Sequence, residues 1–235
     1  MNSVAIIVYS LGLLVFGWRR ILAYLRYFQQ EEYSARRFWV WIRAKMAFDR
    51  RGLCVAASTT LFSLLSANPI PTLVVATLGT LSYIGIACFI EEDPRISGKI
   101  KLNMTQRATK IAHLSFALFL GLSFVWMLCA CPSCHSSDRA YNPFQTVAQL
   151  SILLVMIPPL LLVVANFILS PAEQALQRSF IEDAKRIMSD VDPFIIGITG
   201  SYGKTGAKAA LGELLTQCLG PTFWPRKSIN TVMGI

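Results

Sequence analysis

The chain is poor in charge and in histidine. Only 15% of its 235 residues are Asp, Glu, Lys or Arg, and it has two histidines. It shows no internal repeat and no low-complexity tract, so solenoids and other repeat architectures are excluded. Its six cysteines do not form the framework of a disulfide-rich secreted domain, because Cys54 and Cys88 lie in apolar segments and Cys218 lies far from the others.

Apolar residues are abundant instead. They make up 54% of the chain, with a mean hydropathy of +0.51, against about 45–50% in soluble globular proteins. The excess is concentrated in blocks, which is typical of membrane helices. A net charge of +9 is compatible with nucleic-acid binding. The basic residues, however, cluster beside the apolar blocks, where Lys and Arg orient membrane helices, so we expect no nucleic-acid partner.

Five apolar blocks predict five membrane spans, at 3–18, 53–67, 70–90, 111–131 and 147–169. The first block has no positively charged start and no small-residue cleavage site, which favours an uncleaved anchor over a signal peptide. The stretch 68–71 holds two prolines and predicts a tight turn, and Pro158 and Pro159 predict a kink in the fifth span. No charged residue lies in the middle of a block, which argues against a proton pump or an ion transporter.

The basic residues predict the topology. They are numerous after the first block and after the third, whereas the turn after the second has none and the segment after the fourth has only Arg139. The two basic groups are Arg19, Arg20, Arg26, Arg36, Arg37, Arg43, Lys45, Arg50 and Arg51, and then Arg95, Lys99, Lys101, Arg107 and Lys110. The positive-inside rule places both groups in the cytoplasm. We therefore expect a multi-pass protein of the inner cell membrane, in contact with the lipid bilayer, with its N-terminus outside and everything after residue 169 inside.

The segment over 24–51 is both basic and aromatic. Two interpretations of it stay open, an interfacial helix on anionic lipid and an ordinary helical loop that packs on its own bundle. Glu91, Glu92 and Asp93 are interpreted as a solvated loop face, and His113 as an interfacial residue at the start of the fourth span.

Beyond residue 169 the composition changes. Ser170 can cap a helix, Pro171 suits a first helical position, and Glu173 completes a capping box. Apolar residues then recur at helical spacing. We therefore expect a connecting amphipathic helix over 170–193.

The remaining chain predicts the start of an α/β domain. Residues 194–199 are apolar and partly β-branched, which is typical of a buried strand. A glycine turn follows, and a helix is expected from about Lys204 to Leu219, where Gly220 and Pro221 end it. Strand, glycine loop and helix in this order open a P-loop α/β domain.

The strongest motif is Gly-Ile-Thr-Gly-Ser-Tyr-Gly-Lys-Thr, at 197–205. A polyphosphate needs convergent backbone N–H groups at a helix N-terminus with no Cβ in the way, and Gly200 and Gly203 permit such a loop. Lys204 can reach the β and γ phosphates, and Thr205 can ligate Mg²⁺. The common pattern has a glycine where this chain has an isoleucine, so a glycine-rich turn with a chance Lys-Thr pair is the alternative.

This motif resembles the P-loop of the Mur ligase superfamily, whose usual form is Gly-(Val/Ile)-Thr-Gly-(Thr/Ser)-x-Gly-Lys-(Thr/Ser). The stretch Asn-Thr-Val-Met-Gly-Ile at 230–235 is similar to the Asn-Thr-x-x-Gly-Ile that follows in some Mur-like ligases. The chain most resembles membrane-anchored, MurF-like ligases of the D-alanyl-D-alanine-adding type. Gly206 departs from the family, which more often has Thr or Ser there.

The resemblance implies an ATP-dependent amide ligase related to the cell wall. A precursor carboxylate would attack the γ-phosphate of ATP, and an amino acid or dipeptide would displace phosphate from the acyl phosphate. By the same resemblance, the nucleotide contacts would come from Gly200, Ser201, Tyr202, Gly203, Lys204, Thr205, Asn230 and Thr231. Lys204 would be the catalytic residue, and Thr205 would hold Mg²⁺.

The resemblance covers only about residues 195–235. The second metal ligand of the family, its catalytic His, its modified Lys and its C-terminal domain all come later in the chain of family members. A parallel sheet cannot close on one or two strands, so we expect an incomplete domain, the N-terminal part of a longer enzyme that does not catalyse ligation by itself. The alternatives are a membrane transporter or sensor with an accessory nucleotide domain, and a non-catalytic membrane protein with a vestigial nucleotide site.

A second motif lies between the fourth and fifth blocks. Cys131, Cys134 and His135 match a c-type haem attachment sequence, and Cys129 adds a third thiol. A metal site or a disulfide is then conceivable too. The short segment leaves too little chain to wrap a macrocycle, so a labile disulfide on the outer side or unpaired thiols are favoured over haem.

Overall fold

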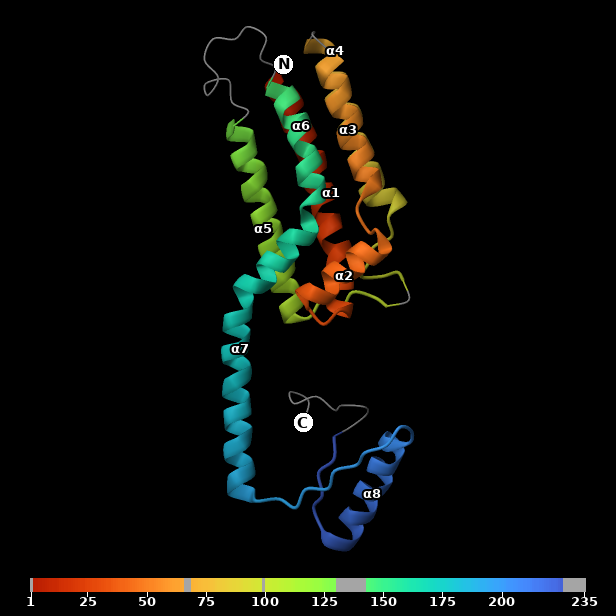
Figure 1. Cartoon of the computed structure of the whole chain (residues 1–235), viewed down its shortest axis with the longest axis vertical. Helices are drawn as coiled ribbons and strands as arrows, with labels where there is room; N and C mark the ends of the chain where they lie inside the picture. Colours follow the sequence, from red (N-terminus) through yellow and green to blue (C-terminus); the bar gives the residue numbers. More distant parts are fainter. Residues whose placement is uncertain (1, 66–68, 99, 130–142, 226–235) are drawn as a thin grey trace. The chain divides into compact units, whose positions relative to one another are not determined.

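The computed structural model describes residues 2–65, 69–98, 100–129 and 143–225 (Figure 1). Every regular element in these ranges is a helix. The elements are α1 Asn2–Gln30, α2 Ala35–Lys45, α3 Arg50–Leu65, α4 Pro69–Gly85, the π-helix η1 Ile86–Ile90, α5 Gln106–Cys129, α6 Pro143–Met156, α7 Pro158–Val191 and α8 Lys204–Leu219. The chain divides into two compact units, Met1–Leu169 and Ser170–Ile235, which are described separately.

Four helices in the described residues are long and apolar enough to cross a membrane, where a span needs about 20 residues. They are Ser3–Gln30, Thr72–Ile90, Gln106–Val125 and Pro158–Val191. The expected second span forms a helix of 16 residues, α3, and the first part of the expected fifth span forms α6, with 14. Four of the five predicted spans thus overlap a helix that is long and apolar enough to cross a membrane, whereas α3, which holds the second, is shorter. These helices indicate a membrane protein, and the count of five spans stays a prediction.

The expected first span is longer than its apolar block. The helix does not end at residue 18 but continues for another three turns to Gln30. Arg19 and Arg20 are accommodated in it because carboxylates from elsewhere in the fold pair with them. The apolar block thus marks where the span lies but not where the helix ends.

The prolines act differently from one another. Pro158 and Pro159 break the helix rather than kink it, because α6 ends at Met156 and α7 begins at Pro158. Proline suits a first helical turn, where the N–H it lacks has no intrahelical acceptor. Pro171, which was expected to begin a new helix, lies inside α7 instead. The expected separate helix over 170–193 is therefore the continuation of α7.

The two prolines of the stretch 68–71 lie in the first turn of α4, which begins at Pro69. That position again costs no intrahelical hydrogen bond. The rest of the expected turn, Asn68, lies outside the described residues.

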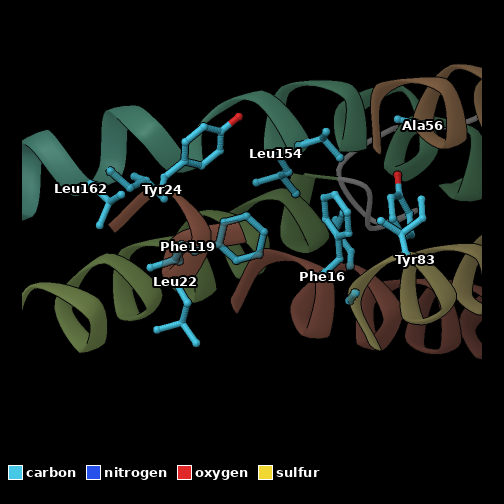
Figure 2. Close-up of a cluster of buried hydrophobic side chains, with 14 of the residues drawn as sticks. Phe16, Leu22, Tyr24, Ala56, Tyr83, Phe119, Leu154 and Leu162 are labelled. Carbon is cyan, nitrogen blue, oxygen red and sulfur yellow. The ribbon is translucent and has the colours of Figure 1, made fainter. Parts of the chain in front are cut away.

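α1 is the central helix of the first unit, where it contacts α2, η1, α4, α5 and α6. Large side chains fill the space between these helices, as Figure 2 shows for Phe16, Phe119, Leu154 and Tyr83. The largest fully buried side chains are Tyr9, Tyr83, Phe16, Phe28, Phe38, Phe119, Phe144, Ile21, Leu22, Leu25, Ile42 and Ile111. In a membrane, van der Waals packing of this kind holds helices together, because lipid is as apolar as the helix surface.

Two glycines let helices approach closely. A Cβ at Gly12 of α1 would lie 2.8 Å from the Cα of Thr80 in α4. A Cβ at Gly79 of α4 would lie 2.7 Å from Cγ2 of Thr59 in α3. Small residues at helix contacts of this kind are typical of membrane bundles.

The basic and aromatic segment after α1 packs on its own bundle. Phe38 and Ile42 of α2 are fully buried, and the ring of Trp41 stacks on Tyr27 of α1 with centroids 4.1 Å apart. In Figure 1, α2 lies across one end of the bundle. The segment thus makes the packing contacts that the second interpretation predicts, and lipid contact by its exposed basic residues stays a prediction.

Candidate functional site: a glycine loop at the start of α8

The segment before the glycine loop forms no strand. α7 ends at Val191, Asp192 has a φ of 43°, and residues 192–200 have no regular structure. Phe194 is 91% exposed, so the expectation of a buried strand over 194–199 is wrong. A strand needs a second strand for its hydrogen bonds, and the described part of this unit, 170–225, contains none.

The loop itself has the backbone that its glycines permit. Gly203 adopts φ 75° and ψ −1°, a left-handed conformation that glycine takes without strain. The helix begins at the next residue, and α8 Lys204–Leu219 agrees with the helix expected from the sequence. The carbonyl of Gly203 accepts the first helical hydrogen bond, from the N–H of Ala207 at 2.9 Å.

Lys204 lies over the loop. Its ammonium group donates a hydrogen bond back to the carbonyl oxygen of Gly200. A positive side chain is therefore held next to a helix N-terminus, where backbone N–H groups and the helix dipole already favour an anion. The arrangement can bind a phosphate group.

The other predicted site residues fall into two groups. Ser201, Tyr202 and Thr205 are exposed beside the loop, and Tyr202 is 96% exposed. Asn230 and Thr231 lie outside the described residues. Residues 200–205 thus form one exposed loop and helix start, and their role in nucleotide binding stays a prediction.

Thr205 is the predicted metal ligand of the loop. Within the described ranges no group of three His, Cys, Asp or Glu side chains could hold a metal ion. Thr205 supplies one hydroxyl oxygen. Mg²⁺ usually takes most of its ligands from phosphate and water, so a single threonine is sufficient for a magnesium that arrives with ATP.

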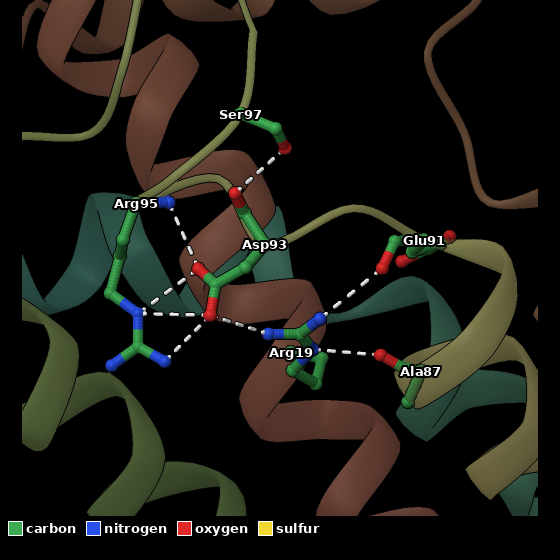
Figure 3. A network of polar contacts seen from close by, with 6 residues as sticks. All are labelled: Arg19, Ala87, Glu91, Asp93, Arg95 and Ser97. Atoms are coloured by element: carbon green, nitrogen blue, oxygen red, sulfur yellow. Dashed lines mark hydrogen bonds and ion pairs between the residues drawn. The ribbon is translucent and has the colours of Figure 1, made fainter.

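A polar network at one end of the first unit was not predicted (Figure 3). Arg19 donates to the carbonyl of Ala87 at 2.8 Å, to the carbonyl of Glu91 at 3.2 Å and to the carboxylate of Asp93 at 3.0 Å. Arg95 also binds Asp93, at 2.7 Å. The acidic run was expected to be a solvated face. That is wrong for Glu91 and Asp93, which pair with arginines, and right for Glu92, which is exposed.

These pairs change the acidity of both carboxyl groups. Hydrogen bonds from Arg95, together with one from Arg19, hold the pKa of Asp93 well below its usual range. Burial raises the pKa of Glu91, an effect that Arg20 opposes and Asp49 reinforces. Asp93 is therefore charged at neutral pH and ties α1 to the segment after η1.

A cluster of hydroxyl groups inside the bundle was also missed. The Tyr9 hydroxyl lies 2.9 Å from Thr59, 3.2 Å from Tyr83 and 2.8 Å from Ser151. These residues come from four helices and are 50 to 142 positions from Tyr9 in the chain, so no local pattern could have found them. Interhelical hydrogen bonds of this kind hold membrane helices in register.

The predicted cysteine motif cannot be placed. Cys131, Cys134 and His135 lie outside the described residues, and Cys129 is the last residue of α5. His113, the predicted interfacial residue, is exposed, and its ring stacks on Trp18 with centroids 6.0 Å apart.

Comparison of the chain with protein-family models, with curated proteins and with solved structures finds no match.

Proposed function

We propose that this is a multi-pass membrane protein whose glycine loop at the start of α8 binds the phosphates of ATP, as part of an ATP-dependent, amide-forming ligase of Mur type. One observation carries the proposal. Gly203 takes a left-handed backbone, and Lys204 bends over the loop to the Gly200 carbonyl. A lysine in this position is already near the place that a phosphate would take.

In this proposal the chain's own groups act in three ways. The backbone N–H groups of residues 200–204 point toward the β and γ phosphates. Lys204 leaves the Gly200 carbonyl and binds phosphate oxygens, where its charge stabilises the transferring phosphoryl group. Thr205 holds the magnesium that accompanies ATP. The remaining ligase chemistry, with a cell-wall carboxylate and an amino acid or dipeptide as substrates, rests on the resemblance of the motif at 197–205.

The proposed topology is supported by the positions of the basic segments. The segment after α1 and the segment after η1 meet at one end of the bundle, where Arg20 binds both Asp49 and Glu91. Gln29 also donates to the carbonyl of Asn103 at 2.9 Å. The positive-inside rule then puts this end in the cytoplasm, the N-terminus outside and the glycine loop on the side where ATP is found.

The transporter alternative has less support. The polar side chains within the spans, such as Tyr9 and Ser151, bind one another and backbone carbonyls. Groups that are already satisfied in this way strengthen helix contacts rather than line a path for a substrate.

The proposal is tested by nucleotide binding to the purified, detergent-solubilised protein, measured with a fluorescent ATP analogue and by competition with ATP. We expect Lys204→Met to weaken binding at least tenfold, because a charge-assisted contact to phosphate is worth about 1.5–3 kcal/mol. The matched control is Lys208→Met, one turn later on the same helix, which should change the affinity less than twofold. If the unaltered protein binds no nucleotide, or if both variants lose affinity equally, the proposal fails.

A further inference from the structure

A groove of about 610 Å³ opens at the end of the bundle where the two basic segments meet. Its walls come from the second half of α1, from α2, from the turn after α2 and from the first residues of α3, with Glu91 at one side. All of these belong to the first unit. The groove is therefore a feature of the bundle itself and shares no residue with the glycine loop of α8.

The charges that line this groove do not balance. Both carboxylates in it, Asp49 and Glu91, are directed to the same cation, Arg20. Lys45 and Arg50 also line it, are exposed, and form no ion pair within the described ranges. Arg51 adds a third exposed cation at the wall. The groove thus presents excess positive charge to its surroundings.

The start of α3 strengthens this field. The N-terminus of a helix is the positive end of its dipole and normally attracts acidic residues. The first turn of α3 instead carries Arg50 and Arg51 and no acidic residue. Asp49 does accept a hydrogen bond from the N–H of Gly52 at 3.0 Å, but it is also held by Arg20. An anion bound in the groove would offset the repulsion between the two arginines and the helix end.

The groove also has an aromatic wall. The stacked rings of Tyr27 and Trp41 line it, together with Phe48, which is 43% exposed. Aromatic residues beside cations are typical of the membrane–water interface, and the groove lies where the apolar part of α1 gives way to its basic end. A ligand that fits both surfaces is an anion with an apolar portion.

We propose that this groove binds the phosphate headgroup of an anionic membrane lipid. The phosphate lies among Lys45, Arg50 and Arg51, and the Tyr27–Trp41 wall contacts the part of the lipid nearest the headgroup. A cation cluster built into a groove differs from a polybasic surface, because it selects its ligand by position as well as by charge.

The test is native mass spectrometry of the full chain in detergent, titrated with phosphatidylglycerol or with phosphatidylcholine of the same acyl chains. We expect phosphatidylglycerol to bind at least tenfold more tightly. The variant Arg50→Gln/Arg51→Gln should lose at least tenfold of that affinity. The matched control Arg36→Gln/Arg43→Gln removes the same charge from exposed positions on α2 that do not line the groove, and it should lose less than twofold.

Three results would overturn the proposal. Equal losses in the two double variants would show general attraction to basic residues rather than a site. Equal affinity for phosphatidylglycerol and phosphatidylcholine would show that the groove does not select an anionic headgroup. Full displacement of phosphatidylglycerol by an equal concentration of inorganic phosphate would assign the groove to a soluble phosphate compound. Thermal unfolding of each variant identifies misfolding, and the single variant Lys45→Gln, at an exposed helix end, tests the same wall if the double variant does not fold.

Discussion

The guanidinium of Arg19 lies 3.0 Å from the carboxylate of Asp93, so that α1 is tied to the segment after η1, 74 residues later in the chain. The same guanidinium donates to the carbonyls of Ala87 and Glu91. Carbonyl groups at the end of a helix have no partners within it. Arg19 thus donates hydrogen bonds to carbonyl groups at the end of the π-helix and also binds the Asp93 carboxylate. The ion pair between Arg19 and Asp93 depends on the negative charge of Asp93.

We predict that acid weakens the bundle through Asp93. Its pKa in the folded protein is lowered by Arg95 and Arg19 from a model-peptide value of 3.8. A carboxyl group with a lowered pKa contributes stability above its unfolded pKa, and that contribution is lost as the pH falls through the folded value. The melting temperature in detergent should therefore fall below about pH 4, and Asp93→Asn should reduce this dependence while costing about 2 kcal/mol at pH 7.

The control for this prediction is Asp190→Asn, at an exposed position of α7, which should leave both the melting temperature and its pH dependence unchanged. Glu91 acts in the opposite direction, because a raised pKa favours the fold at low pH and disfavours it as the pH rises. Glu91 is present in both proteins, so the comparison of Asp93→Asn with the unaltered protein isolates the loss of stability at low pH that is due to Asp93. An unchanged acid transition in Asp93→Asn would contradict the prediction.

We predict that Tyr9→Phe destabilises the bundle by about 1 kcal/mol, the size of an interhelical hydrogen bond in a membrane protein. Thr59 and Ser151 still have backbone carbonyls as hydrogen-bond partners. The hydroxyl of Tyr83 is therefore the group most affected by the lost hydrogen bond. The phenylalanine ring keeps the contact with Phe144. Thermal unfolding measures the change, and Tyr202→Phe, at a position that is 96% exposed, should have no effect. A Tyr9→Phe protein as stable as the parent would show that the hydroxyl cluster does not contribute to the stability of the bundle.

We predict that Gly12→Ala separates α1 from α4. The added Cβ would lie 2.8 Å from the backbone Cα of Thr80, which cannot move without moving its helix, and overpacking of this kind costs about 1–3 kcal/mol. Gly121→Ala is the matched control. It has no atom within 4 Å of the added Cβ, and alanine favours a helix over glycine by about 1 kcal/mol. Equal melting temperatures for the two variants would mean that α1 and α4 are not in close contact.

The sequence predicted best what local signals determine. Apolar blocks located the long helices, and a glycine on each side gave α8 its start at Lys204 and its end at Leu219. The sequence predicted less well those features, such as the end of a helix, that depend on contacts with residues distant in the chain. α1 continues past its apolar block because Asp49, Glu91 and Asp93 pair with its arginines, and these partners are unknown until the chain is folded.

The candidate site shows the same division. The left-handed Gly203 and the position of Lys204 follow from residues within a few positions of each other, and the motif predicted both. The strand over 194–199 depends on a second strand that residues 170–225 do not supply, so an apolar, β-branched sequence was not sufficient. Pro171 failed as a helix start for a related reason. Capping residues favour a helix start, but they do not end a helix that already runs through them.

We predict that the cysteines report the proposed topology. In intact cells, a membrane-impermeant maleimide should label a protein whose only cysteine is Cys134, because the segment after α5 is proposed to lie outside. A protein with only Cys218, which is exposed on α8, should react only after the membrane is permeabilised. Cys88 lies in the candidate span Thr72–Ile90 and should stay unlabelled in both states, since a charged, water-soluble reagent does not enter the apolar part of the bilayer. Labelling of Cys218 in intact cells would place the glycine loop away from ATP and would contradict both the topology and the proposed function.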